Sequence, residues 1–182
     1  DVVFVGSFFP ERVAWFNAID WTGIDLGIYG TWKGLGLKKQ VRDLCRAGQV
    51  DNVFASALYR KAKIGLNLYR TRGSRRLPLT HADGRRLVPE SLSPRAYELA
   101  ACGSFHLSEP RAEVAEVFGA DVPTFNSPQE AAALIRLWLA DEPRRAAVAA
   151  SLPARVAEAS WVTRAKTVAS DLQQLLQQRA AA

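Results

Sequence analysis

The fold is decided by the stretch Glu90-Ser-Leu-Ser-Pro-Arg-Ala-Tyr-Glu-Leu-Ala-Ala-Cys-Gly-Ser-Phe-His-Leu107. Ser93 is a favourable helix N-cap, and Pro94 suits the first helical position, where its missing N–H costs nothing. Gly103 suits the left-handed residue that ends a helix. The apolar run 104–107 follows at once and predicts a strand. A helix joined directly to a strand in this way is typical of an α/β domain.

The start of this helix is predicted to bind an anion. We expect free N–H groups at 93–96, and together with the positive end of the helix dipole they form a ready phosphate site. Arg95 lies in the first turn, where a positive charge is unfavourable unless a negative ligand offsets it. The sequence therefore predicts a phosphate near Ser93, Pro94 and Arg95.

The rest of the chain alternates short apolar runs with segments of helical spacing. This alternation predicts a Rossmann-like three-layer α/β/α sandwich with a parallel sheet, in one domain over residues 1–182. Ligands bind at the carboxyl ends of such strands, so Gly6, Ser7, Gly30, Tyr69 and Ser93 should share one edge. The predicted strands are 2–6, 25–30, 63–69, 104–107 and 122–125. The predicted helices include 37–47, 52–62, 111–118 and 128–140, and the segment 142–178 is predicted to be helical with breaks near Pro153 and Ser160.

Composition excludes several classes of protein. The chain has 182 residues, 48% of them hydrophobic, and no apolar run long enough for a membrane span or signal peptide, so a cytoplasmic location is expected. It contains no GxGxxG, GxxxxGK[ST] or GxSxG motif, which disfavours nicotinamide binding, P-loop hydrolysis and serine hydrolysis. The two histidines, His81 and His106, are too few for a zinc site, and no metal is expected.

The net charge of +6 is unevenly distributed along the sequence. Residues 60–86 contain nine basic side chains and one acidic side chain, a net charge of +8. A nucleic acid, a diphosphate, an anionic acceptor or solubility alone could each account for this block, although no stacking aromatics are interleaved with it. We expect the loop from Arg70 to Pro89 to be poorly ordered until a diphosphate binds.

The stretch 91–107 resembles the donor-site helix of GT-B glycosyltransferases, most closely the spore-maturation (CgeB-type) group with its RxxExxACG pattern. Glu90 and Glu98 also match the E-x7-E spacing of many retaining GT-B enzymes. Weaker similarity runs from Val-Phe-Val-Gly-Ser at the start to Trp-Val-Thr-Arg near the end. The resemblance implies the C-terminal, nucleotide-sugar-binding half of a GT-B enzyme. Residues 142–178 would then be terminal helices that pack toward an N-terminal acceptor domain outside this sequence.

The resemblance also implies roles for individual residues. Glu90 would meet the donor sugar at the catalytic centre, and Glu98 would accept hydrogen bonds from the ribose hydroxyls. Arg95 would bind the diphosphate, because GT-B enzymes stabilise the diphosphate with helix N–H groups and basic side chains rather than with a metal ion. The remaining donor-binding candidates are Gly6, Ser7, Arg12, Gln49, Val50, Ser93 and Pro94, with the nucleobase near Gln49 and Val50. Each also has a purely structural interpretation, such as a turn at Gly6 or a solvated surface at Glu98.

The predicted function is therefore a hexosyltransferase-like glycosyltransferase that uses a nucleoside-diphosphate sugar, UDP or GDP being expected, without a cofactor. The isolated chain is expected to bind its donor but not to transfer it. A non-catalytic nucleotide-binding or assembly module of the same fold is the first alternative, and a basic nucleic-acid-binding domain is the second.

Overall fold

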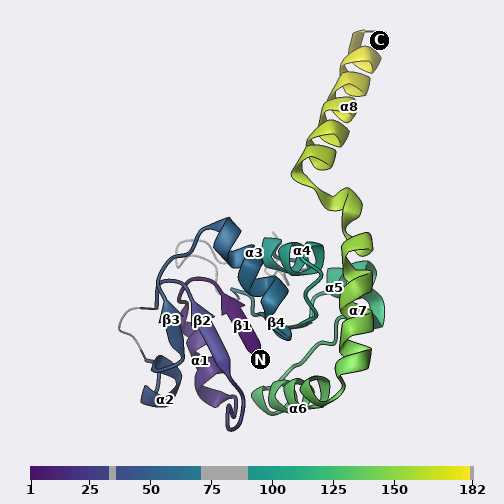
Figure 1. Ribbon diagram of the computed structural model, residues 1–182. Coiled ribbons are helices and arrows are strands. Elements are labelled where there is room, and N and C mark those ends of the chain that lie inside the picture. Colours follow the sequence, from purple (N-terminus) through teal and green to yellow (C-terminus); the bar gives the residue numbers. More distant parts are fainter. Residues whose placement is uncertain (33–35, 71–89, 181–182) are drawn as a thin grey trace, which may run out of the picture.

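The computed structural model describes residues 1–32, 36–70 and 90–180. A parallel sheet forms the centre of the molecule, with strand order β3-β2-β1-β4-β5 (Figure 1). Every neighbouring pair in it is parallel. The strands are β1 (Val2–Val5), β2 (Leu26–Tyr29), β3 (Cys45–Ala47), β4 (Ile64–Asn67) and β5 (His106–Ser108).

Helices connect the strands and cover both faces of the sheet, which confirms the predicted α/β Rossmann-like architecture. The α-helices are α1 (Pro10–Ala18), α2 (Lys39–Arg42), α3 (Asn52–Lys61), α4 (Pro94–Ala101), α5 (Ala112–Phe118), α6 (Pro128–Ala140), α7 (Glu142–Arg155) and α8 (Trp161–Ala180). Two short 3₁₀ helices, η1 (Gly119–Asp121) and η2 (Ala157–Ala159), follow α5 and α7.

Successive residues of a strand pack into two different hydrophobic cores, one on each face of the sheet, because both faces are covered by helices. Phe4 in β1 packs with Phe16 of α1 and belongs to the same cluster as Ile135 of α6. Val3, on the opposite face, packs with Tyr59 of α3 and Leu99 of α4. The two cores hold α4 and α1 on opposite faces of β1 and β4, with their first turns near the carboxyl ends of those strands.

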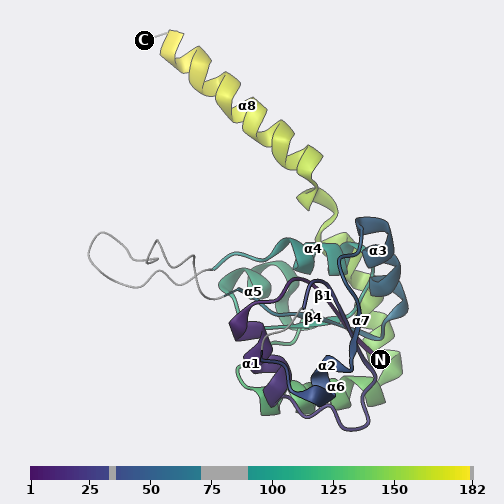
Figure 2. The ribbon, with the colours of Figure 1, turned by 90° about the vertical axis from the view of Figure 1, so that its left-hand side faces the viewer.

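The C-terminal helices lie outside the sheet. Helix α7 packs against α4, α5 and α6, and Leu152 is fully buried there. Helix α8 then leaves the body of the molecule and extends away from it in both views (Figures 1 and 2). Its start is capped by Ser160, whose hydroxyl accepts from the Thr163 N–H at 3.0 Å. The predicted break near Ser160 is confirmed, whereas α7 continues through Pro153 and ends at Arg155.

Two predicted elements are wrong. The segment 37–47 is not one helix: α2 ends at Arg42, and the chain then forms the edge strand β3, with the Ile28 N–H donating to the Leu44 carbonyl at 3.0 Å. The segment 122–125 is not a full strand and makes only one bridge, Ser108 to Thr124. Pro123 lacks the N–H that a longer ladder would need. The predicted behaviour of the loop 70–89 concerns residues 71–89, which lie outside the described part.

Candidate functional site

Two arginines from different helices meet at the carboxyl ends of the two central strands. The Arg95 Nε donates to the Val5 carbonyl at 2.7 Å, and its Nη1 donates to the Leu68 carbonyl at 3.3 Å. The Arg12 Nε donates to the same Leu68 carbonyl at 3.2 Å. The Arg12 Nη1 also donates to the Ser7 carbonyl at 2.9 Å. Ordinary backbone acceptors therefore hold two like charges side by side.

Burial and like charge disfavour this pair of cations, and nearby carboxylates offset that effect only in part. Burial, the larger cause, and the charge of Arg95 together lower the pKa of Arg12 to about 10, although Glu11 and Glu109 raise it. Burial likewise lowers the pKa of Arg95. Both remain charged at neutral pH, and neither forms an ion pair with a carboxylate of the described residues. The Phe4 ring makes cation–π contacts with both guanidinium groups, and its centroid lies 4.5 Å from Arg95 Cζ and 5.4 Å from Arg12 Cζ.

The first turn of α4 adds N–H groups to the same place, although fewer than the sequence predicted. Pro94 has no N–H, and the Ala96 N–H donates to the Ser93 carbonyl at 3.0 Å. The Ser93 side chain does not cap the helix; its hydroxyl donates to the Asn67 Oδ1 of β4 at 2.8 Å. The N–H groups of Ser93 and Arg95 make no hydrogen bond to another described group.

Gly6 and Ser7 also lie at this edge, as predicted. The Gly6 N–H donates to the Tyr29 carbonyl at 2.8 Å, which continues the pairing of β1 with β2. Ser7 is exposed and contributes its carbonyl to Arg12. A Cβ on Gly30 would fall on the Gly6 carbonyl, so the missing side chain of Gly30 allows the strand ends to lie close together.

The two glutamates occupy different surroundings. Glu98 is exposed on α4, and its charge contributes to the raised pKa of Tyr59, for which burial is the main cause. It therefore lies near Arg95 and Tyr59. Glu90 is exposed before α4, and its carbonyl accepts from the Glu113 N–H at 3.2 Å. Its carboxylate makes no ion pair or hydrogen bond within the described residues, so the structure does not join it to the arginine pair.

Gln49 and Val50 follow β3 at the same carboxyl edge of the sheet. The Gly30 N–H donates to the Gly48 carbonyl at 2.9 Å, which ties this segment to the end of β2. Gln49 is exposed, whereas Val50 is half-buried against the cluster that contains Tyr59. Both residues are thus displaced sideways from the arginines, toward β2 and β3.

A buried polar network supports the site at the ends of β4 and β5. The sequence did not predict this network. Glu109 follows β5 and accepts the Tyr69 N–H, and burial raises the pKa of its carboxyl group. The Asn67 Nδ2 donates to the Ser108 Oγ at 3.0 Å. These contacts fix the end of β4 and the residue that follows it, Leu68, whose carbonyl is shared by both arginines. A run of polar residues directly after a buried strand, Ser108-Glu109, was the available sequence signal.

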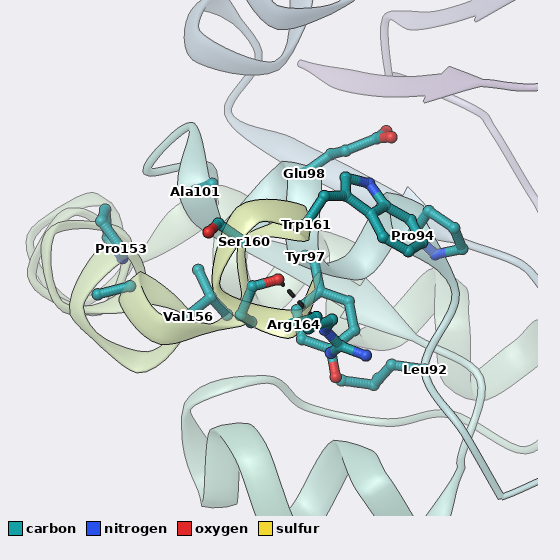
Figure 3. Close-up of a pocket in the computed structure, with 12 residues that line it drawn as sticks. Leu92, Pro94, Tyr97, Glu98, Ala101, Pro153, Val156, Ser160, Trp161 and Arg164 are labelled. Carbon is teal, nitrogen blue, oxygen red and sulfur yellow. Dashed lines mark hydrogen bonds between the residues drawn. The ribbon is translucent and has the colours of Figure 1, made fainter. Parts of the chain in front are cut away.

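A pocket of about 450 Å³ lies on the outer side of α4, against the start of α8 (Figure 3). Trp161 is 80% exposed and lines this pocket together with Pro94 (Figure 3). The Arg164 guanidinium lies 5.0 Å from the Tyr97 ring centroid, and its Nε donates to the Ala159 carbonyl at 3.3 Å. Glu98 also lines the pocket, but its carboxylate points away from the other lining side chains.

The described ranges contain no group of three or more His, Cys, Asp or Glu side chains placed to hold a metal ion. None of the helices described here combines the length and the apolar character that a membrane span requires. The cytoplasmic location expected from the sequence stays a prediction.

Comparison with known proteins gives the family. A family model described as "Glycosyl transferase-like" matches residues 12–170. Sucrose-phosphate synthase from Thermosynechococcus elongatus has a similar fold, with a TM-score of 0.60 and 17% sequence identity over 99% of this chain. The chain spans 45% of that structure, and its architecture corresponds to one half of a GT-B glycosyltransferase. No curated protein matches the chain. Because the family match covers most of the sequence, this chain belongs to the glycosyl transferase-like family.

Proposed function

We propose that this chain binds the nucleoside-diphosphate sugar of a glycosyltransferase, with the diphosphate at Arg12, Arg95 and the first turn of α4. The observation that carries the proposal is the shared use of one carbonyl, that of Leu68, by two guanidinium groups. Two neighbouring buried charges that form no direct ion pair with a carboxylate of the described residues are stabilised when an anion joins them. A diphosphate supplies that charge and accepts from both guanidinium groups and from the free N–H groups.

Isothermal calorimetry with UDP, GDP, ADP and dTDP, and with their sugar conjugates, tests this proposal. We expect binding to at least one nucleoside diphosphate and weaker binding to the matching monophosphate. A parallel titration with a single-stranded oligonucleotide distinguishes this proposal from the alternative of a basic nucleic-acid-binding domain. Tight oligonucleotide binding without any nucleotide binding would contradict the donor-site proposal.

Glu98 is proposed to accept hydrogen bonds from the ribose hydroxyls of the donor, and Glu90 to face its sugar. Glu98 lies one helical turn after Arg95, so a ligand bound at the arginine pair can reach it. Glu98→Gln is expected to weaken donor binding roughly ten- to a hundred-fold because charge-assisted hydrogen bonds are lost. Glu116→Gln, an exposed glutamate on α5, is the matched control and should leave the affinity unchanged. Donor affinity of the Glu98 variant within about two-fold of the parent would contradict this assignment.

The nucleobase is proposed to lie toward Gln49 and Val50, on the β2–β3 side of the arginine pair. UDP and GDP are the proposed donor nucleotides, and the CgeB-type group is the proposed subfamily. In this arrangement the diphosphate charge is neutralised by guanidinium and backbone N–H groups, so the proposed chemistry does not call for a metal ion.

The acceptor is proposed to bind to a second domain of a longer protein, which packs against α8. This helix exposes a stripe of apolar side chains with alternating spacings of four and three residues, which is the pattern of a helix that buries one face. Within the described residues nothing covers that stripe, which consists of Trp161, Ala165, Val168, Leu172 and Leu175.

The isolated chain is accordingly expected to bind its donor without transferring the sugar. A GT-B active site lies between two such domains, and this chain provides one. A radiolabelled nucleotide-sugar assay that compares the chain with a longer protein checks this expectation. Efficient transfer by the 182-residue chain alone would contradict it, whereas donor binding without turnover in the longer protein would favour the non-catalytic alternative.

A further inference from the structure

Gly6 occupies a position where the fold needs space rather than backbone freedom. Its φ is not among the positive values found at five other glycines, so an ordinary residue could adopt its conformation. A Cβ built at this position, however, would overlap the Nη2 of Arg95. It would also come within 3.1 Å of two atoms of the Phe4 ring. The missing side chain at residue 6 is therefore the space that the Arg95 guanidinium fills.

The remaining contacts of Arg95 show why that space matters. Its Nε and Nη1 donate to the Val5 and Leu68 carbonyls, and its guanidinium lies over Phe4. The Tyr59 hydroxyl counteracts the lowering of the Arg95 pKa, for which burial is the main cause. A Cβ at residue 6 would occupy the place of the Arg95 Nη2, so the guanidinium would have to shift and lose hydrogen bonds.

We propose that Gly6 is a positioning residue, which keeps Arg95 aligned for the donor diphosphate by leaving no Cβ in its path. The inference rests on the proposed function of the arginine pair. It gives Gly6 an indirect role, in place of the direct contact with the donor that the sequence analysis predicted. Because the overlapping atom is the far end of a flexible side chain, a methyl group at residue 6 should displace Arg95 and leave the sheet intact.

A double-mutant cycle tests whether Gly6 acts through Arg95. The four proteins are the parent, Gly6→Ala, Arg95→Gln and the double variant, each titrated with UDP and GDP by calorimetry. We expect Gly6→Ala to weaken binding at least about five-fold in the parent and less than about two-fold when Arg95 is already Gln. Gly48→Ala is the matched control, because a Cβ there meets nothing within 4 Å, and it should leave affinity unchanged.

The outcomes separate the inference from the proposed function. No nucleotide binding by the parent, or full binding by Arg95→Gln, overturns the proposed function and the inference with it. Normal binding by Gly6→Ala, or an equal loss in both backgrounds, overturns the role of Gly6 alone.

A measurement without ligand supplies a second readout. In ¹⁵N NMR spectra the Arg95 Nε–H, bonded to the Val5 carbonyl, should exchange slowly with water in the parent and in Gly48→Ala. It should exchange rapidly in Gly6→Ala, while the backbone amides of β1 and β4 stay protected. Unchanged protection of the Arg95 Nε–H in Gly6→Ala would overturn the inference.

Discussion

Replacing Arg95 with Gln is expected to abolish most nucleotide binding, with a loss of roughly 3–4 kcal/mol, or a few hundred-fold in affinity. The variant removes one of two charges proposed to contact the diphosphate and also the hydrogen bonds to Val5 and Leu68 that orient it. Glutamine keeps part of the length and the polarity of the arginine side chain, so the Phe4 ring stays covered. The effect should exceed that of Glu98→Gln, because Glu98 is exposed and contacts a neutral part of the ligand.

Calorimetry with UDP and GDP measures this loss, and Arg136→Gln is the matched control. Arg136 is an exposed arginine of α6, and its pair with Asp20, at 2.8 Å, is of the kind that contributes little to stability. The control should bind like the parent. If Arg95→Gln bound within about five-fold of the parent, the diphosphate could not lie where we place it.

Stability is expected to fall by about 3 kcal/mol between pH 6.5 and pH 4 because of His106 alone. His106 is fully buried in β5, and burial lowers its pKa from 6.5 to about 4. Between these two pH values His106 is protonated in the unfolded chain but neutral in the folded chain, so the free energy of unfolding decreases as the pH falls through this window. Above about pH 8 the imidazole is neutral in both states and contributes no pH dependence.

The packing around His106 explains why its pKa is lowered. The Nδ1 lies 3.2 Å from the Ser104 carbonyl, the ring meets Phe118 edge-on at 5.3 Å, and the buried Nε2 has no partner in the described residues. Urea unfolding at pH 7 and pH 4 for the parent, His106→Leu and His106→Asn isolates the titration, since both variants remove it with different packing. Equal pH dependence in all three proteins would show that His106 does not titrate as inferred.

Local sequence signals predicted some elements well and others poorly. Helix α6 has the bounds that the sequence predicted, and Ser127, Pro128 and Glu130 specify its start. The Ser127 Oγ accepts from the Glu130 N–H at 3.1 Å, and the Glu130 carboxylate accepts from the Asn126 N–H at 2.7 Å. The strand β3 was missed because its three residues are at most half-buried and pair on one side only. Its conformation depends on the neighbouring strand rather than on its own sequence.

The same contrast applies to the candidate site. Arg95 could be predicted because a positive charge in the first turn of a helix needs a counter-charge. Its partner groups could not, because the meeting of Arg12, Arg95 and the Leu68 carbonyl depends on the way α1 and α4 pack on opposite faces of the sheet. Ser93 was placed correctly at the start of α4 but with the wrong contact, since the buried Asn67 attracts its hydroxyl.

A crystal structure of the chain grown with a nucleoside diphosphate, UDP or GDP, tests the central claim most directly. The account predicts that the two phosphates lie within hydrogen-bond distance of the Arg12 and Arg95 guanidinium groups and of the first N–H groups of α4, with the ribose toward Glu98. A nucleotide bound instead in the pocket between α4 and α8, or one that leaves the arginine pair without an anion, would contradict it.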